Sequence, residues 1–164
     1  YGQCDLPDLE EGAVYSQASA GEHHTVLLRG DGRPVTCGVT HWHQCDIPDL
    51  EEGVVCTQVS AGDFHSVLLL SDGRAVACGT GEQCNVPGLE EGVGYAQVSA
   101  GGTHTVLLRS DGRVVACGET GDGRCDFPLL EEGIEYVQVS AGYWHTILLR
   151  SDGRAVACGD DEDG

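Results

Sequence analysis

Short segments in which apolar and polar residues alternate recur along the whole chain. Residues 136–140 read Tyr-Val-Gln-Val-Ser, and the small pair Ala141-Gly142 that follows permits a tight turn. A second strand is expected over 145–150, an Asp-Gly hairpin at 151–153, and a returning strand over 154–158. None of these segments has the apolar spacing that a helical repeat needs. The pattern therefore predicts a unit of short antiparallel strands.

The same pattern occurs four times, so the chain is a tandem repeat. The units cover approximately residues 1–41, 42–82, 83–122 and 123–164, which together form a single repeat domain, 1–164. In each unit a proline-containing piece, such as 125–128, fits a brief edge strand, where a missing amide donor is tolerated. Three or four strands in about 40 residues is typical of a propeller blade or of a stacked β-repeat.

Three elements of the unit carry a family resemblance. They are Val98-Ser99-Ala100-Gly101-Gly102-Thr103-His104-Thr105, Ser110-Asp111-Gly112-Arg113, and Cys37-Gly38 followed by His43-Gln44-Cys45. In these elements the chain resembles the RCC1-type repeat family over nearly its whole length. The resemblance implies a β-propeller, usually with seven blades, that presents loops to protein partners. We therefore expect an all-β fold of four RCC1-like, blade-like units.

The two ends of the chain carry complementary halves of one connector. The chain opens with Gly2-Gln3-Cys4, which elsewhere follows a Cys-Gly pair, and the last such pair is Cys158-Gly159. Two arrangements are compatible with this phasing: a closed four-bladed ring, or an arc of a larger or polymeric array. The absence of an initiator methionine favours the arc, whose uncapped ends favour association from end to end.

Eight of the nine cysteines belong to the repeat frame. One interpretation is a disulfide across each connector, which pairs Cys37 with Cys45, Cys78 with Cys84, Cys117 with Cys125, and Cys158 with Cys4 or a neighbouring chain. The alternative is that these positions are buried apolar sites, and Cys56, which replaces a tyrosine, is interpreted as a small core residue. No Cys-x-x-Cys pair occurs, so the spacing of the cysteines does not indicate a zinc site. The paired cysteines favour an oxidising, extracytoplasmic or secreted setting.

Six of the seven histidines fall into two groups. One histidine recurs in every unit, and a residue that every unit needs is most simply structural, with a ring nitrogen bonded to backbone. These framework histidines are His24, His65, His104 and His145. His41 and His43 instead lie in a variable connector beside Cys45; two ligands on a loop make no complete metal site, so no metal centre is predicted.

The charge of the chain excludes several kinds of partner. The formal net charge is −19, with 27 acidic residues against 8 basic ones, so nucleic acid is not expected to bind. No apolar run approaches the roughly 20 residues that span a bilayer, so membrane insertion is not expected. A Leu-Glu-Glu-Gly element recurs once per unit and is interpreted as a solvated acidic face. The alternative is weak binding of divalent cations, aided by the acidic tail 160–163, and no other cofactor is expected.

No catalytic motif is present, so we do not expect an enzyme. The units differ mainly in two loops, and binding residues are usually carried on loops of a rigid frame. The candidate contacts with a protein partner are Trp42, Phe64, Tyr143, Trp144, His23, His41 and His43. The sequence therefore predicts a non-catalytic scaffold for protein interaction or structural assembly, which self-associates end to end. The alternative that the resemblance implies is a guanine-nucleotide exchange factor of a small GTPase.

Overall fold

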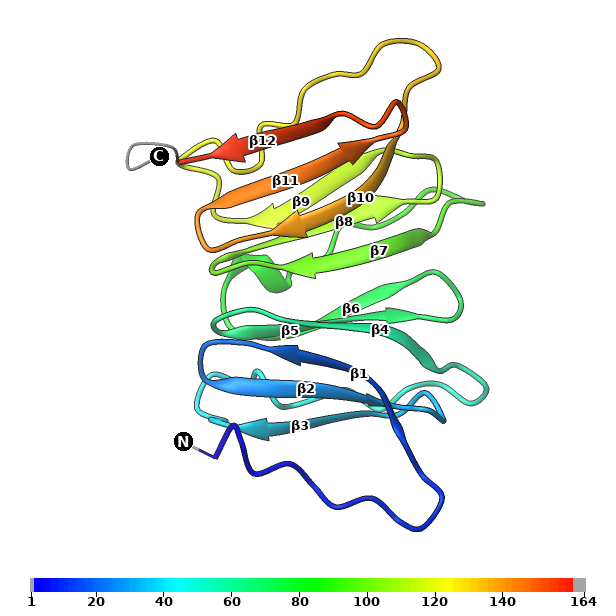
Figure 1. The fold of residues 1–164 in the computed structure, drawn as a ribbon, viewed down its shortest axis with the longest axis vertical. Helices are drawn as coiled ribbons and strands as arrows, with labels where there is room; N and C mark the ends of the chain where they lie inside the picture. Colours follow the sequence, from blue (N-terminus) through cyan, green and yellow to red (C-terminus); the bar gives the residue numbers. More distant parts are fainter. Residues whose placement is uncertain (1, 161–164) are drawn as a thin grey trace.

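The computed structural model describes residues 2–160 and consists of four three-stranded antiparallel sheets, one per unit (Figure 1). We call each sheet a blade. The strands are β1 (Tyr15–Ala20), β2 (His24–Arg29) and β3 (Pro34–Gly38) in blade 1; β4 (Cys56–Ala61), β5 (His65–Leu70) and β6 (Ala75–Gly79) in blade 2; β7 (Tyr95–Ala100), β8 (His104–Arg109) and β9 (Val114–Gly118) in blade 3; and β10 (Tyr136–Ala141), β11 (His145–Arg150) and β12 (Ala155–Gly159) in blade 4. The predicted all-β repeat is confirmed.

The blades stack in one row and do not close into a ring. Blade 1 lies at one end of the row and blade 4 at the other (Figure 1). The first strands β1, β4, β7 and β10 contact one another in turn, so they form the inner side of the stack. The four blades form an open row, so the closed four-bladed ring that the sequence allowed is wrong.

Turn chemistry within each blade follows the sequence. In blade 1 the Asp31 carboxylate accepts a hydrogen bond from the Arg33 amide at 3.2 Å, and Gly32 has a φ of 81°, which favours glycine. The first strand of each blade contains a bulge near its start. The expected edge strand at 125–128 is absent from the described chain: the Phe127 amide donates to the Cys125 carbonyl in a turn instead. The only helix among residues 2–160 is η1 (Glu82–Cys84), and none there is long and apolar enough to cross a membrane.

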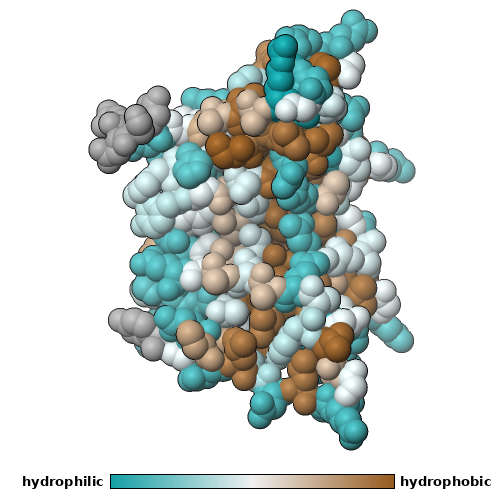
Figure 2. Space-filling view, viewed as in Figure 1, coloured by the Kyte–Doolittle hydropathy of each residue, from teal (hydrophilic) through white to brown (hydrophobic). Residues whose placement is uncertain are grey.

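The hydrophobic core lies between blades rather than within one blade. Val26 and Leu28 of β2 pack against Val59 and Leu68 of blade 2, and equivalent clusters join blade 2 to blade 3 and blade 3 to blade 4. Cys56 lies buried in the first of these clusters. Figure 2 shows apolar side chains in a band that runs along the stack. Each blade therefore depends on its neighbour for burial, as expected of a repeat protein.

Glutamine and serine side chains join the inner strands of adjacent blades. Gln58 donates through Nε2 to the Val98 carbonyl and accepts from the Val98 amide, both at 3.0 Å. Ser60 Oγ accepts from the Ala100 amide at 2.9 Å. Equivalent contacts recur at the other two junctions, except that Gln17 Nε2 donates to the Thr57 carbonyl. The counterparts in blade 4, Gln138 and Ser140, are exposed on its outer face.

Three framework histidines bond a hydroxyl of the next blade rather than backbone. His24 Nε2 lies 2.8 Å from Ser66 Oγ, His65 Nε2 2.8 Å from Thr105 Oγ1, and His104 Nε2 2.9 Å from Thr146 Oγ1. The Ser66 and Thr105 hydroxyls donate to backbone carbonyls at 2.6 and 2.8 Å, so each accepts the imidazole proton. His24 and His65 therefore carry a proton on Nε2, and their Nδ1 atoms have no hydrogen-bond partner within residues 2–160. His145, on the outer face of blade 4, is exposed.

All nine cysteines are free thiols, so the predicted bridges are not formed in this structure. The affected pairs are Cys37 with Cys45, Cys78 with Cys84, Cys117 with Cys125, and Cys158 with Cys4. The two thiols of a connector point to different carbonyls: Cys37 Sγ donates to Gln3 at 3.5 Å and Cys45 Sγ to Val39 at 3.3 Å. Burial raises the pKa of Cys78 and Cys117 to about 11, which keeps both thiols protonated at neutral pH.

Candidate functional site

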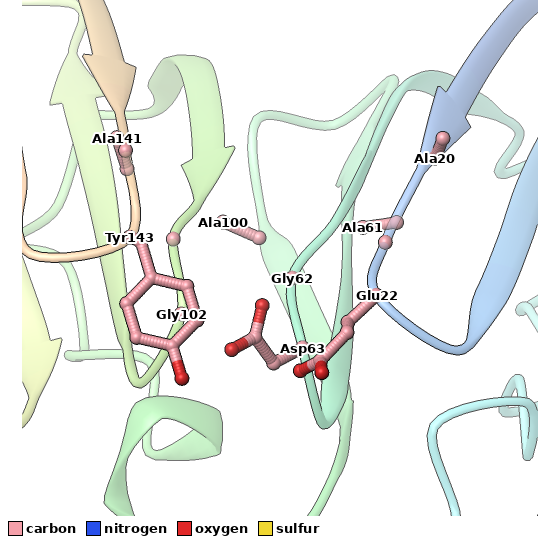
Figure 3. Close-up of a pocket in the computed structure, with 12 residues that line it drawn as sticks. Ala20, Glu22, Ala61, Gly62, Asp63, Ala100, Gly102, Ala141 and Tyr143 are labelled. Carbon is pink, nitrogen blue, oxygen red and sulfur yellow. The ribbon is translucent and has the colours of Figure 1, made fainter.

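The turns between the first and second strands of all four blades lie at the same end of the stack. We call this end the loop end. The four Ala-Gly pairs there leave a hollow of about 260 Å³, which we call the inner hollow. It is lined by residues 20–22, 61–63, 100–102 and 141–143 (Figure 3). Because alanine and glycine have little or no side chain, the few larger groups in the hollow face open space.

Two carboxylates and a phenol supply the chemistry of the inner hollow. Asp63 is 7% exposed, and its carboxylate points between Glu22 and Tyr143 (Figure 3). Burial, and then the charge of Glu22, raise the pKa of Asp63. The charge of Asp63 in turn raises the pKa of the Tyr143 phenol. The hollow is therefore an acidic site.

An aromatic group lies beside the hollow, built from two connected blades. The ring of Trp42 stacks on His23, with 5.6 Å between centroids, and meets Phe64 edge-on at 5.0 Å. His41 meets Trp42 edge-on, with 6.5 Å between the ring centroids. The Trp42 amide is held by the buried side chain of Gln44, which accepts its proton at 3.0 Å. We call His23, Trp42 and Phe64 the blade 1–2 aromatic group.

A second aromatic group belongs to blade 4. The rings of Tyr143 and Trp144 lie 4.6 Å apart, and the side chains are 47% and 49% exposed. The Arg124 guanidinium lies 4.7 Å from the Trp144 ring centroid. Arg124 is only 3% exposed because it also bonds Asp122 and, at 2.9 Å, Thr103 Oγ1. The arginine therefore fixes Trp144 while leaving part of the ring open to solvent.

The structure brings most of the predicted contact residues together. Six of the seven lie in the two aromatic groups or beside them: His23, His41, Trp42, Phe64, Tyr143 and Trp144. His43 differs, because its Nδ1 lies 2.7 Å from the Asp46 carboxylate and its φ is 59°.

Three residues of the site were not predicted from the sequence as individual candidates: Glu22, Asp63 and Arg124. Glu22 and Asp63 occupy the variable positions after the Ala-Gly pair. Arg124 stands where the other connectors have Gln3, Gln44 and Gln83, so its departure from the repeat was the available signal.

The recurring Leu-Glu-Glu-Gly acids lie away from this site. Their first glutamates pair with arginines of the second strands or hairpins: Glu90 with Arg109, Glu131 with Arg150 and Glu51 with Arg74. No group of three or more His, Cys, Asp or Glu side chains that could hold a metal ion occurs within 2–160. Residues 161–163 of the acidic tail lie outside the described residues.

Several solved structures share this fold. Yeast RCC1 (Prp20), determined with Kap60, matches with a TM-score of 0.76 and 18% identity over 94% of this chain and 45% of its own. Human WBSCR16 matches with a TM-score of 0.75 and 18% identity over 93% of this chain and 50% of its own. The ectodomain of the Physcomitrella patens receptor kinase CR4 matches with a TM-score of 0.67 and 20% identity over 94% of this chain and 43% of its own. The chain therefore spans about half the length of these structures or less.

Sequence comparison gives the family. A search of curated proteins finds no match. The family model "Regulator of chromosome condensation (RCC1) repeat", however, matches residues 56–84, 95–124 and 136–164. These three segments fall on blades 2, 3 and 4 and together make up more than half of the chain. The chain therefore belongs to the RCC1 repeat family.

Proposed function

We propose that the chain is a non-catalytic scaffold that binds a protein partner through its loop end. The observation that carries this proposal is the gathering of aromatic side chains from separate blades around one acidic hollow. Aromatic residues with part of their surface open are enriched at the centres of protein interfaces. The partner surface is formed by the blade 1–2 aromatic group together with Tyr143 and Trp144.

The scaffold beneath these side chains suits such a role. The Trp42 ring packs against His23 and Phe64, and Arg124 holds the Trp144 ring, so both rings are ordered before a partner arrives. An interface that is preorganised in this way loses little side-chain entropy on binding. A solved relative illustrates the kind of partner: Prp20p from Saccharomyces cerevisiae has binding properties toward Gsp1p and histones.

Replacement of Trp42 and Trp144 by alanine is expected to weaken partner binding at least a hundredfold, since buried aromatic anchors often contribute about 2 kcal/mol or more each. Ligands can be selected from a displayed library of random peptides on the wild-type chain, and their affinities measured by biolayer interferometry. The double variant should retain its β circular dichroism.

Leu129→Ala is the matched control, because Leu129 is 100% exposed and lies beside the Asp111-Gly112 hairpin, at the opposite end of blades 3 and 4. This control should bind the selected peptides as the wild type does. Equal binding by the double variant, or failure to select any ligand, would contradict the proposed surface.

The open ends of the stack support a second role, self-association. At each internal junction a histidine meets a hydroxyl of the next blade. The counterparts at the two ends are His145 on blade 4, which is exposed beside the exposed Ile147, and Thr25 on blade 1, whose hydroxyl donates to the Gln3 carbonyl at 2.8 Å. We propose that blade 1 of a second copy docks on blade 4 through the same kind of contact that joins neighbouring blades within one chain.

Sedimentation velocity tests this docking. The wild type is expected to show a sedimentation coefficient that rises with concentration at physiological salt, where charges are screened over about 8 Å. Ile147→Asp places a charge in the proposed contact and should abolish the rise, whereas Leu129→Asp should not. A wild-type coefficient that stays constant would exclude self-association through these faces.

Guanine-nucleotide exchange on a small GTPase is the alternative to the scaffold. It rests on family membership rather than on a residue of this chain. A nucleotide-release assay with a Ran-type GTPase separates the two, and acceleration there would replace the scaffold proposal.

A further inference from the structure

The inner hollow contains a buried carboxylate whose bonding is incomplete. Asp63 is more than nine-tenths buried, and within residues 2–160 its Oδ2 has no hydrogen-bond partner. Tyr143 interacts with this carboxylate, but a buried oxygen without a partner is still unfavourable, because the atoms around it do not replace the water it has lost. A group that brings positive charge to the hollow would remove this penalty.

The surroundings of Asp63 add to its negative field. Glu22 enters the hollow from blade 1, and Figure 3 shows its carboxylate directed toward Asp63. The basic side chains nearby are His23, whose Nε2 lies 3.4 Å from Glu22, and Arg124, which is bonded to Asp122. Two carboxylates therefore face this space, while the charge of the nearby arginine is committed to another acid.

The shape of the hollow favours an organic cation over a metal ion. Its other large side chain is Tyr143, and a guanidinium or ammonium group is attracted to an aromatic face as well as to a carboxylate. The rest of the lining is alanine and glycine. A Cβ added at Gly102 would lie 3.3 Å from both Asp63 Oδ2 and the Tyr143 ring. The absence of a side chain at Gly102 therefore leaves the space between the carboxylate and the ring open. Two carboxylates alone make a poor calcium site, which needs six or more oxygen ligands.

We propose that the inner hollow is a subsite for one basic side chain, lysine or arginine, of a protein partner that docks on the loop end. The inference rests on the proposed scaffold function and adds the chemistry of the ligand. The cation would lie between Asp63 and Glu22 against the Tyr143 ring, while the aromatic groups contact the flanking residues of the partner. The net charge of −19 would steer such a basic segment toward the chain.

Titration of small probes into the ¹⁵N-labelled chain tests this subsite separately from the whole interface. The probes are Nα-acetyl-arginine amide, its neutral isostere Nα-acetyl-citrulline amide, Nα-acetyl-lysine amide and calcium chloride. The arginine or lysine probe is expected to shift the amides of Gly62, Asp63, Gly102 and Tyr143, with a dissociation constant on the order of 1 mM. Citrulline should leave these amides unchanged.

Asp63→Asn is the decisive variant, because it keeps the shape of the side chain and removes its charge. Binding of the basic probe should weaken at least tenfold. Asp49→Asn removes the same charge from an exposed connector and should bind as the wild type does. Removal of an unfavourable buried charge should also leave Asp63→Asn at least as stable as the wild type, so lost binding cannot be ascribed to unfolding.

Three results would overturn the subsite: equal binding of citrulline, unchanged binding by Asp63→Asn, or shifts at these amides with calcium alone. Absence of shifts with every probe would overturn it as well. The scaffold proposal would survive each of these results if the selected peptides still lose affinity for the double tryptophan variant. The two proposals therefore fail independently.

Discussion

Lowering the pH from about 7 to about 4.5 is expected to unfold the chain, because three buried histidines are neutral in the folded state. Burial lowers the pKa of His65 to about 3, and the neighbouring rings of His24 and His104 add to this shift. Burial likewise lowers the pKa of His24 and His104 to about 4. A proton on Nδ1 of any of these rings would find no acceptor in the part of the chain that the structure describes.

The direction of this pH effect follows from which state of the chain, folded or unfolded, binds more protons. The unfolded histidines have a pKa of about 6.5, so between about pH 6.5 and pH 4 the unfolded chain binds protons that the folded chain does not. The free energy of unfolding therefore falls as the pH is lowered through this window. Each histidine contributes at most about 1.4 kcal/mol per pH unit, so three contribute up to about 4 kcal/mol per unit. The free energy of unfolding of a typical domain is only about 5–15 kcal/mol in total.

Urea denaturation at a series of pH values measures this slope. His65→Gln should reduce the slope by about one third, since one of three titrating rings is gone. His145→Gln is the matched control, because its ring occupies the same position of the repeat but is exposed on blade 4. A slope that is identical in the wild type and His65→Gln would show that the buried histidines are not responsible.

Gly101→Ala is expected to destabilise the chain by about 3 kcal/mol or more, because overpacking at a site that cannot relax is costly. A Cβ at Gly101 would lie 2.4 Å from His104 Cε1 and 2.5 Å from the Gly142 carbonyl oxygen. The first atom belongs to the ring that bonds blade 4, and the second to the backbone of blade 4 itself. The substitution therefore separates two blades, and a thermal midpoint lower by about 10 °C should report it.

Gly88→Ala provides the comparison, because a Cβ there meets no atom within 4 Å and its φ needs no glycine. Its free energy of unfolding should lie within about 0.5 kcal/mol of the wild-type value. A loss of similar size in both variants would mean that backbone entropy, rather than the approach of the two blades, accounts for the effect at Gly101.

The strands could be predicted from the sequence because each depends on a local signal. The alternation in 136–140 and the Asp152-Gly153 turn indicate a strand and a hairpin whatever surrounds them, and both are present in the structure. The Ala-Gly pairs were interpreted as turn residues. Their tighter requirement, space for a histidine and for the next blade, became visible only when the blades were placed side by side.

Contacts between blades were less predictable, because they depend on residues about 40 positions apart. Gln58 and Gln97 look like ordinary polar strand residues, yet each bridges to the backbone of the following blade. The disulfide interpretation rested on the recurrence of the cysteines and on the short connectors between them, and the structure directs their thiols to backbone carbonyls instead. Recurrence shows that a position matters in every unit, but it does not show whether two such positions meet.

The candidate site was predicted in part. The aromatic residues stood out because they break an otherwise uniform repeat, and they do gather at the loop end. Asp63 was not singled out, because one aspartate among 27 acidic residues carries no signal in the sequence. Its burial and its unpartnered oxygen are properties of the fold.

The central claim is that the loop end is the partner-binding surface of this chain. The most direct test is to map the amide shifts caused by the tightest peptide selected on the full wild-type chain. The account predicts that the shifts cluster in the four turns of the loop end and the connector that carries Trp42, around residues 21–23, 41–43, 62–64, 102–103 and 143–144. Shifts centred instead on the Asp-Gly hairpins at the opposite end, with the loop-end amides unchanged, would contradict it.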